Sequence, residues 1–406
     1  MKKSKTKLRS IKKVLIVFII FGLGVVFFWR LFSIEQPKQE GDVKFSATLL
    51  QVPKIYDRWQ YFDIEGYGVR ASSDLRLSYG DKLEIEGVAK EGRLNNPKIN
   101  VVGSSGWQEN LFNLRERLKE KITAALPEPQ AALLAGILLG AKEELPVDFK
   151  ESLRKTGTIH VVVVSGYNIS VVAGFLIGLS RFIRRQYAIF LGLVGIAFYT
   201  FLVGADAPAV RAAIMGSAAF LATLAGRQRF PLYFLFLAAF VMLLVKPTIV
   251  EDVGFQLSFL ATAGIIFFQE KILRFFKFVP KAVSDNLATT LAAQSLVVPV
   301  IFYHFGSVSA ISPLANAALL WIIPIATIFG FVFLAISLVI PFLATVLAWI
   351  LWAFLTIFVF LVEGFAKVSF AYLSFSAGNF WPALLYYAAL VAIIFYLRYV
   401  RMAGHK

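Results

Sequence analysis

The sequence contains no cysteine and only three histidines among its 406 residues. Without cysteine the chain can form neither a disulfide nor a thiolate metal site. The histidines, His160, His304 and His405, cannot be assembled into the H-x-x-E-H, H-E-x-x-H or H-x-H-x-D-H patterns of zinc enzymes. A zinc hydrolase or zinc nuclease site is therefore excluded, and we expect neither a metal ion nor any other cofactor.

Charged residues are also scarce, at 16% of the chain, whereas hydrophobic residues reach 58% and the mean hydropathy is +0.71. Forty phenylalanines strengthen this apolar character, as expected for side chains that face lipid or pack in a thick apolar bundle. Several apolar runs are long enough to cross a bilayer as helices. The composition therefore predicts a polytopic α-helical membrane protein.

Acidic residues are outnumbered, which gives the chain a formal net charge of +16. Nucleic-acid binding would explain such an excess, but the cytoplasmic loops of membrane proteins also gather Lys and Arg. Basic residues cluster before the first apolar run, at 14–28, and this run ends without a small-residue cleavage site. We therefore interpret residues 1–33 as a cytoplasmic basic segment followed by an uncleaved membrane anchor.

Apolar segments follow one another closely from residue 159 onward, and together with the anchor they predict about ten spans. The predicted spans are 159–180, 187–204, 209–226, 231–245, 254–270, 287–303, 312–340, 342–366 and 380–398. When these spans alternate from a cytoplasmic N-terminus, three basic loops and the basic C-terminal tail fall on the cytoplasmic side, with Lys246 and Lys367 as the main exceptions. Residues 159–406 are thus predicted to form one multi-span domain, with both chain termini in the cytoplasm.

The stretch 42–106 has a different character, because short alternating segments are separated by turn signals rich in Gly, Asn and Pro. This pattern is typical of a small all-β domain, here external, and we expect a five-stranded barrel of the oligonucleotide-binding (OB) type. Nine basic residues are balanced by nine acidic ones, as in a spacer or docking module. Contact with single-stranded DNA is the alternative, through Tyr56, Arg58, Trp59 and Tyr61.

Residues 107–158 connect the β-domain to the spans. An amphipathic helix at 109–126 is too charged to cross the bilayer, so it should lie in the outer interface. The apolar run 131–140 is too short to cross and is therefore expected to be re-entrant or buried. A charged external connector follows at 142–155.

Polar residues interrupt the predicted spans at several places. The first group, in TGTIHVVVVSGYN, is His160, Ser165, Gly166 and Asn168, and the others are Arg211, Asp252, Gln256, Ser258, Gln294, His304 and Asn316. Each alone fits a helix-to-helix hydrogen bond, whereas their number favours a shared hydrated interior. We expect Arg211 to be the best anion contact, with Asp252 pairing with it or capping a helix.

An intramembrane serine hydrolase is a remote alternative, based on His160 and Ser165. The serine lies in V-V-S-G rather than in a nucleophile elbow, and no paired acid accompanies it. We therefore predict no catalytic residues and no enzymatic activity.

The sequence resembles the ComEC-type competence family, the membrane channels for DNA uptake in transformable bacteria. The resemblance runs from the β-domain to about residue 330 and rests on the strings LPEPQAALLAGILLGAKEELP, TGTIHVVVVSGYN, VRAAIM, GFQLSFLA and YHFGSVSAISPLAN. In that family an H-x-x-x-x-S-G-x-H stretch is characteristic, and His160, Ser165 and Gly166 match it. Asn168 stands where the second histidine is usual, which argues against protonation or metal binding at this position.

This resemblance implies a channel for single-stranded DNA in the bacterial cytoplasmic membrane, with the polar residues above lining the path. Many family members carry a C-terminal metallo-β-lactamase-like domain, whereas this sequence stops at Lys406 and has too few histidines for one. We therefore expect a separate nuclease and a separate DNA receptor. Because no G-x-x-x-x-G-K-[ST] loop is present, we also expect a separate ATP-driven motor. The alternative is a transporter of another anionic or lipid-linked solute.

Overall fold

The computed structural model describes residues 40–392 except 50–52, 57, 76, 78–79, 105, 142–144, 163–167, 170, 173, 175–183, 227–229, 369–371, 375–377, 379–380 and 391. The predicted anchor at 1–33, Ser165, Gly166 and the end of the last predicted span therefore lie outside the described residues. The chain forms two compact units. One contains the N-terminal sheet and residues 237–252, and the other contains the remaining helices.

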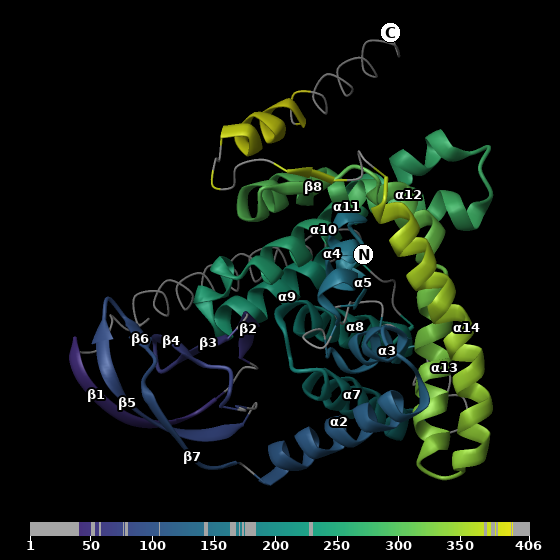
Figure 1. Ribbon diagram of the computed structural model, residues 1–406. Helices are drawn as coiled ribbons and strands as arrows, with labels where there is room; N and C mark the ends of the chain where they lie inside the picture. Colours follow the sequence, from purple (N-terminus) through teal and green to yellow (C-terminus); the bar gives the residue numbers. More distant parts are fainter. Residues whose placement is uncertain are drawn as a thin grey trace, which may run out of the picture. The chain divides into compact units, whose positions relative to one another are not determined.

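The first unit is built on a curled seven-stranded β-sheet, drawn in purple and blue in Figure 1. Its strands are β1 (Gly41–Thr48), β2 (Lys54–Tyr56), β3 (Trp59–Ile64), β4 (Tyr67–Ser72), β5 (Asp81–Lys90), β6 (Arg93–Asn95) and β7 (Lys98–Ser104). The strand order is β1-β5-β6-β4-β3-β2, and β7 pairs with β5. Every pair is antiparallel except β4 with β6.

The all-β character predicted for 42–106 is confirmed, but the sheet has seven strands where the sequence predicts five. The additional strands, β2 and β6, have only three residues each. Strand β6 is short because the chain turns on both sides of it, with positive φ at Glu91, Gly92 and Asn96. Such short segments carry too little alternation to be recognised from the sequence.

Side-chain alternation gives this sheet one packed face and one open face. Phe62 and Ile64 of β3 and Val69 and Ala71 of β4 are buried in a single apolar cluster. The residues that alternate with them in β3, Tyr61 and Asp63, are exposed and point to the opposite face. The open face is therefore where the β-domain presents its polar and aromatic groups.

The second unit is mainly helical, and two of its helices end at glycines in the left-handed conformation. Its elements are α2 (Gly106–Ala125), α3 (Gln130–Leu139), α4 (Val147–Lys155), α5 (Ile159–Val162), α7 (Arg185–Leu202), α8 (Ala207–Leu224), α10 (Val253–Leu273), the 3-10 turn η3 (Arg274–Phe276), α11 (Lys281–Phe305), β8 (Ser307–Ser309), α12 (Ser312–Leu319), α13 (Ile322–Ser337), α14 (Pro341–Ala366) and β9 (Tyr372–Ser374). Helix α9 (Pro231–Val245) belongs to this unit only as far as residue 236, and its remainder and the 3-10 turn η2 (Pro247–Glu251) belong to the first unit. Helices α3 and α11 end at left-handed glycines, Gly140 and Gly306, as is common at helix C-termini.

Four helices are long and apolar enough to cross a membrane: Ala207–Leu224, Val253–Phe276, Val283–Phe305 and Pro341–Ala366. The pair α12 and α13 is bent by 43° and makes a fifth span if it is counted as one. The segment 307–340 is too long for one perpendicular helix and contains Pro313 and Pro324, so the sequence predicts a broken or re-entrant helix followed by a full span. The bend agrees with this prediction. The chain is thus a membrane protein with four or five candidate spans among the described residues, and ten spans are not shown.

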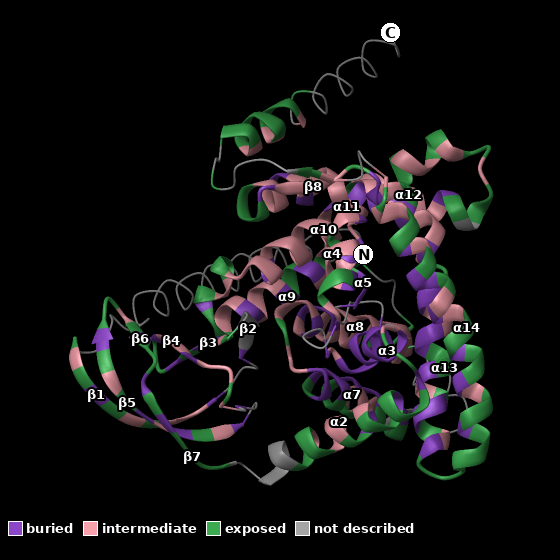
Figure 2. Cartoon of the chain, viewed as in Figure 1, coloured by how far each residue is buried: buried purple, intermediate pink, exposed green. Residues whose placement is uncertain are grey.

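Helix α3 forms the centre of the helical unit, and Figure 2 shows it as buried along its length. All ten of its residues are buried, and it packs against α5, α13 and α14. The close approach depends on glycine, because a Cβ atom on Gly330 of α13 would lie 2.7 Å from the side chain of Leu138. Of the two predictions for 131–140, re-entrant or buried, the structure shows a buried helix.

Candidate functional site

Arg211 joins two candidate spans through neutral acceptors. It lies in the first half of α8 and is only 9% exposed. Its Nη1 donates hydrogen bonds to the carbonyl oxygen of Ser258 and to the hydroxyl of Thr262, both on α10. Its Nε is buried without a partner. Among the described residues no carboxylate neutralises this guanidinium, so a buried positive charge faces only dipoles.

Thr262 contacts Arg211 and was not among the residues predicted from the sequence. It follows Ser258 by four residues, so the two side chains lie on the same face of α10. The Thr262 hydroxyl also donates to the Ser258 carbonyl at 2.9 Å, which keeps both acceptors beside Arg211. The (i, i+4) spacing was the available signal, but it becomes informative only once the partner helix is known.

A second polar pair joins α10 to α11. The Nε2 atom of His304 lies 3.2 Å from Oε1 of Gln256, near the C-terminal end of α11. Gln256 and Ser258 are two residues apart, so they point to different sides of α10. Helix α10 therefore carries polar groups toward both of its neighbours, α8 and α11, and His304 is itself exposed.

Two further predicted residues, Asn168 and Asn316, are buried and hydrogen-bonded to other parts of the helical unit. Asn168 is fully buried and donates through Nδ2 to the carbonyl oxygen of Ile137 on α3, at 2.7 Å. Asn316 donates to Oγ of Ser312, one turn earlier on α12, at 3.2 Å. The Oδ1 atom of each asparagine is buried without a partner. Each therefore keeps one unused hydrogen-bond acceptor inside the apolar unit.

The turn at 156–158, which precedes the first predicted span, packs against the start of α12. Gly157 has a φ of +69°, and a Cβ atom there would lie 2.6 Å from Ser312. Oγ of Ser309 donates to the carbonyl oxygen of Lys155 at 2.7 Å. Thr156 and Thr158 flank the glycine, are fully buried, and were not predicted as site residues. The contact brings two polar segments of the sequence together.

The remaining predicted residues of the helical unit are less connected. His160 is exposed, and its Nδ1 lies 3.0 Å from the carbonyl oxygen of Gly157. Gln294 is half-buried on α11, and Asp252 is half-buried at the residue before α10. The predicted residues that the structure brings together include Arg211 with the carbonyl oxygen of Ser258, and Gln256 with His304.

On the β-sheet the predicted aromatic residues meet an arginine that the sequence analysis missed. The guanidinium carbon of Arg70 lies 4.0 Å from the ring centre of Trp59 and 6.0 Å from that of Tyr61, a cation–π arrangement. Tyr61 and Arg70 are direct partners in the β3–β4 register. Arg58 is exposed in the turn before β3, and the side chain of Tyr56 lies outside the described residues.

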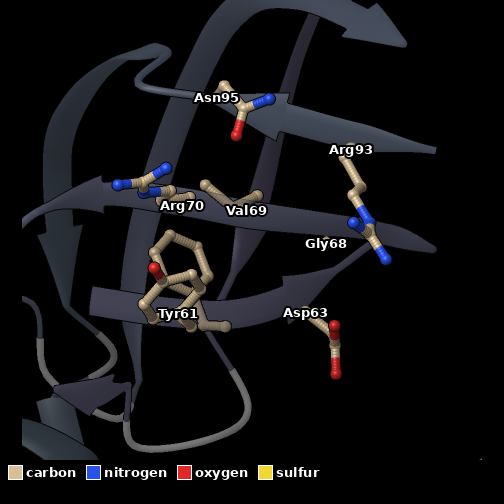
Figure 3. A pocket seen from close by; sticks show the side chains of 8 residues that line it. Tyr61, Asp63, Gly68, Val69, Arg70, Arg93 and Asn95 are labelled. Atoms are coloured by element: carbon tan, nitrogen blue, oxygen red, sulfur yellow. The ribbon is translucent and has the colours of Figure 1, made fainter. Parts of the chain in front are cut away.

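A pocket of about 440 Å³ opens beside this cation–π group. In Figure 3, Asp63 and Arg93 lie on one side of Gly68, and Arg70 and Tyr61 lie on the other. The pocket is lined by Tyr61, Phe62, Asp63, Gly68, Val69, Arg70, Arg93 and Asn95. Two guanidinium groups, an amide and an aromatic ring suit an anionic or planar ligand, whereas the carboxylate of Asp63 makes the site less basic.

Comparison with known proteins places the helical unit in a described family. A family model described as "Competence protein" matches residues 137–400. Similar proteins include an uncharacterized protein of Aquifex aeolicus (strain VF5), which is 34% identical over 226 residues. ComE operon protein 3 of Bacillus subtilis (strain 168) is 24% identical over 208 residues, and the uncharacterized protein YcaI of Escherichia coli (strain K12) is 28% identical over 226.

These alignments cover about half of this chain and only part of each relative. They cover 54%, 51% and 50% of this chain, and 52%, 26% and 28% of the A. aeolicus, B. subtilis and E. coli proteins. The chain therefore spans between a quarter and a half of the length of these relatives. No solved structure matches the chain significantly.

Proposed function

The chain belongs to the Competence protein family, and from that premise we propose that it conducts single-stranded DNA across the bacterial cytoplasmic membrane. In this proposal the protein is a channel rather than an enzyme. The helical unit forms the path through the bilayer, and the β-sheet unit receives the strand outside. Both chain termini are then cytoplasmic, as the basic loops suggest.

The observation that carries the proposal is the guanidinium of Arg211. It is buried between α8 and α10, two helices that are long and apolar enough to span a membrane. A charged group at membrane depth is costly and is usually found where it serves an ion or substrate path. With only a carbonyl and a hydroxyl as acceptors, Arg211 keeps its charge available to a passing phosphate.

The β-sheet unit supplies a second contact for the strand in this proposal. We interpret its curled sheet as an OB-type fold whose open face carries Trp59, Tyr61 and Arg70. Base-to-aromatic stacking is worth about 1–3 kcal/mol per base and tolerates any sequence. The arginine beside the rings adds attraction for the phosphate backbone. Such a face would suit uptake that does not depend on sequence.

The proposal assigns energy supply and strand processing to other proteins. The sequence contains no Walker A loop, so a cytoplasmic ATP-driven motor would move the strand. A separate receptor would deliver DNA, and a separate nuclease would remove the other strand.

A transporter of a smaller anionic or lipid-linked solute is the second candidate. The observation that favours it is that Asn168 bonds to α3 and Asn316 bonds within its own helix, rather than to each other. Two separate polar positions of this kind could bind a small solute as well as a long polymer. Loss of DNA uptake at unchanged lipid composition in a deletion strain would favour the DNA channel.

Uptake of labelled DNA tests the role of Arg211. We expect Arg211→Ala, expressed at matched level in a deletion strain, to reduce uptake by at least tenfold, and Arg211→Lys to retain part of it. A tenfold reduction corresponds to a free-energy change of about 1.4 kcal/mol. This is a modest loss for the removal of a charged group at membrane depth.

The matched control removes a neutral hydrogen bond from α10, the helix that carries the two acceptors of Arg211. Gln269 on α10 donates to the hydroxyl of Thr289 on α11 at 2.7 Å, and Gln269→Ala should leave uptake near wild type. Equal losses in both variants would mean that Arg211 acts only in packing. Wild-type uptake by Arg211→Ala would remove it from the path.

A further inference from the structure

The turn between α10 and α11 exposes large aromatic side chains. We call residues 271–281 the hairpin tip; they comprise the last residues of α10, the turn η3 and the first residue of α11. Phe275 is 83% exposed and Phe278 is fully exposed. Large aromatic side chains that lie fully open on a protein surface commonly mark a binding face.

The hairpin tip is also strongly basic. Lys271, Arg274, Lys277 and Lys281 are all exposed, and residues 271–281 contain no acidic residue. Within the described part of the chain, none of these four side chains forms an ion pair. Lys271 instead lies 5.4 Å from the ring of Phe268. Basic and aromatic groups therefore alternate along one exposed segment without internal compensation.

The hairpin tip lies between two candidate spans, and this position places it near a membrane surface. It joins the candidate spans Val253–Phe276 and Val283–Phe305, and Phe275 belongs to the last turn of the first. Few residues separate the two spans, so the tip cannot rise far above the end of either helix. Its side chains must therefore lie at the level of the lipid headgroups when these helices cross a bilayer.

We propose that the hairpin tip binds anionic phospholipids, with Phe275 and Phe278 inserted among the acyl chains and the four basic side chains on the phosphates. Aromatic side chains partition into the interface, and long basic side chains reach its phosphates. Each basic residue near an anionic leaflet adds about fivefold to the affinity. This inference does not depend on what the protein transports.

A single-stranded nucleic acid is the other polyanion that such a segment suits, because stacked bases also use aromatic faces. Lipid is favoured because the tip ends two adjacent spans and therefore meets headgroups whether or not a strand is present. The inference concerns the lipid leaflet, and DNA contact is an outcome that the experiment distinguishes.

The absence of cysteine allows a direct test in the full-length protein. Phe278→Cys is labelled with an environment-sensitive fluorophore, and the protein is reconstituted into nanodiscs. A nitroxide quencher is carried either on phosphatidylglycerol or on phosphatidylcholine. We expect stronger quenching by the phosphatidylglycerol label, and we expect high salt to reduce this preference.

The turn between α13 and α14 provides a matched control position. Val339 is 76% exposed, lies between two apolar helices and has no basic neighbour from Leu338 to Phe342. A label at Val339→Cys should be quenched equally by both lipids. In the Phe278→Cys background, Lys277→Gln with Lys281→Gln should lower the relative preference for phosphatidylglycerol by about fivefold for each charge removed.

Two results would overturn the inference. Equal quenching at position 278 by both labelled lipids would show that the tip has no preference for anionic headgroups. Displacement of the lipid quencher by a single-stranded oligonucleotide, at a concentration that leaves position 339 unaffected, would assign the tip to nucleic acid instead. Unchanged elution in gel filtration would show that each variant is folded.

Discussion

Gly157 shows how a single residue fixes the contact between two polar segments. It adopts a left-handed backbone conformation that other residues reach only with strain, and its missing side chain leaves room for Ser312. The buried hydroxyls of Thr156 and Thr158 lie 2.8 Å apart beside it. The position of α12 relative to the turn at 156–158 therefore depends on the absence of one methyl group.

Gly157→Ala should lower the free energy of unfolding by more than the left-handed backbone conformation of an alanine alone would cost. The left-handed backbone costs about 1–2 kcal/mol for alanine, and overpacking against Ser312 adds about 1–3 kcal/mol. Gly226→Ala is the matched control, because Gly226 has a φ of +62° with no atom within 4 Å of the added Cβ. Thermal unfolding in detergent would measure both. Equal destabilisation would contradict the contact with Ser312.

At the residue scale, sequence reasoning found polar groups but not their partners. Arg211 and Trp59 stand out by residue type and position in the chain. Thr262 and Arg70 complete their surroundings, and neither could be assigned without a helix pair or a strand register. The hydrogen-bond partner of a polar residue in a membrane helix depends on which helix faces pack together. The hydropathy of the sequence does not predict this packing.

At the scale of elements, α10 and α11 form a closely packed pair. A Cβ atom on Gly264 would lie 2.3 Å from the carbonyl oxygen of Ala292, so the two backbones are nearly in contact. Small residues at such crossings allow helices to approach in a membrane. The same helix pair brings Gln256 of α10 within 3.2 Å of His304 of α11.

Gly264→Ala should separate this helix pair. Because the obstructing atom is backbone rather than a flexible side chain, we expect a loss of about 1–3 kcal/mol of unfolding free energy. Gly216→Ala on α8 meets only Ile169 at an ordinary 3.5 Å, and it should be neutral or stabilising by about 0.5–1 kcal/mol. Chemical denaturation of both purified variants would check this. If Gly216→Ala lowered the stability and Gly264→Ala did not, the predicted close contact between α10 and α11 would be refuted.

The boundaries of helices could be predicted where a continuous apolar run has clear ends. The predicted span 231–245 coincides with α9, and the predicted break in 312–340 appears as the bend between α12 and α13. The sheet was harder, because the parallel pairing of β6 with β4 joins residues that are distant in sequence. Register of that kind follows from the folded sheet and not from local alternation.

At the scale of the whole molecule, composition predicts a membrane protein, and the alternating pattern of residues 42–106 predicts its β-domain. The number of spans did not follow in the same way, because helices such as Pro231–Val245 are apolar yet shorter than a membrane is thick. The burial of α3 was one of two open alternatives. A ten-residue apolar run cannot reveal whether lipid or protein surrounds it, and here protein does.

Electrical recording from the purified protein in a planar bilayer tests the central claim most directly. If the helical unit is a path for a single strand, the protein should conduct ions, and a single-stranded oligonucleotide should block the current from one side. The same strand annealed to its complement should block far less, because the duplex is wider. A bilayer without current, or a current that neither form of DNA changes, would contradict the account.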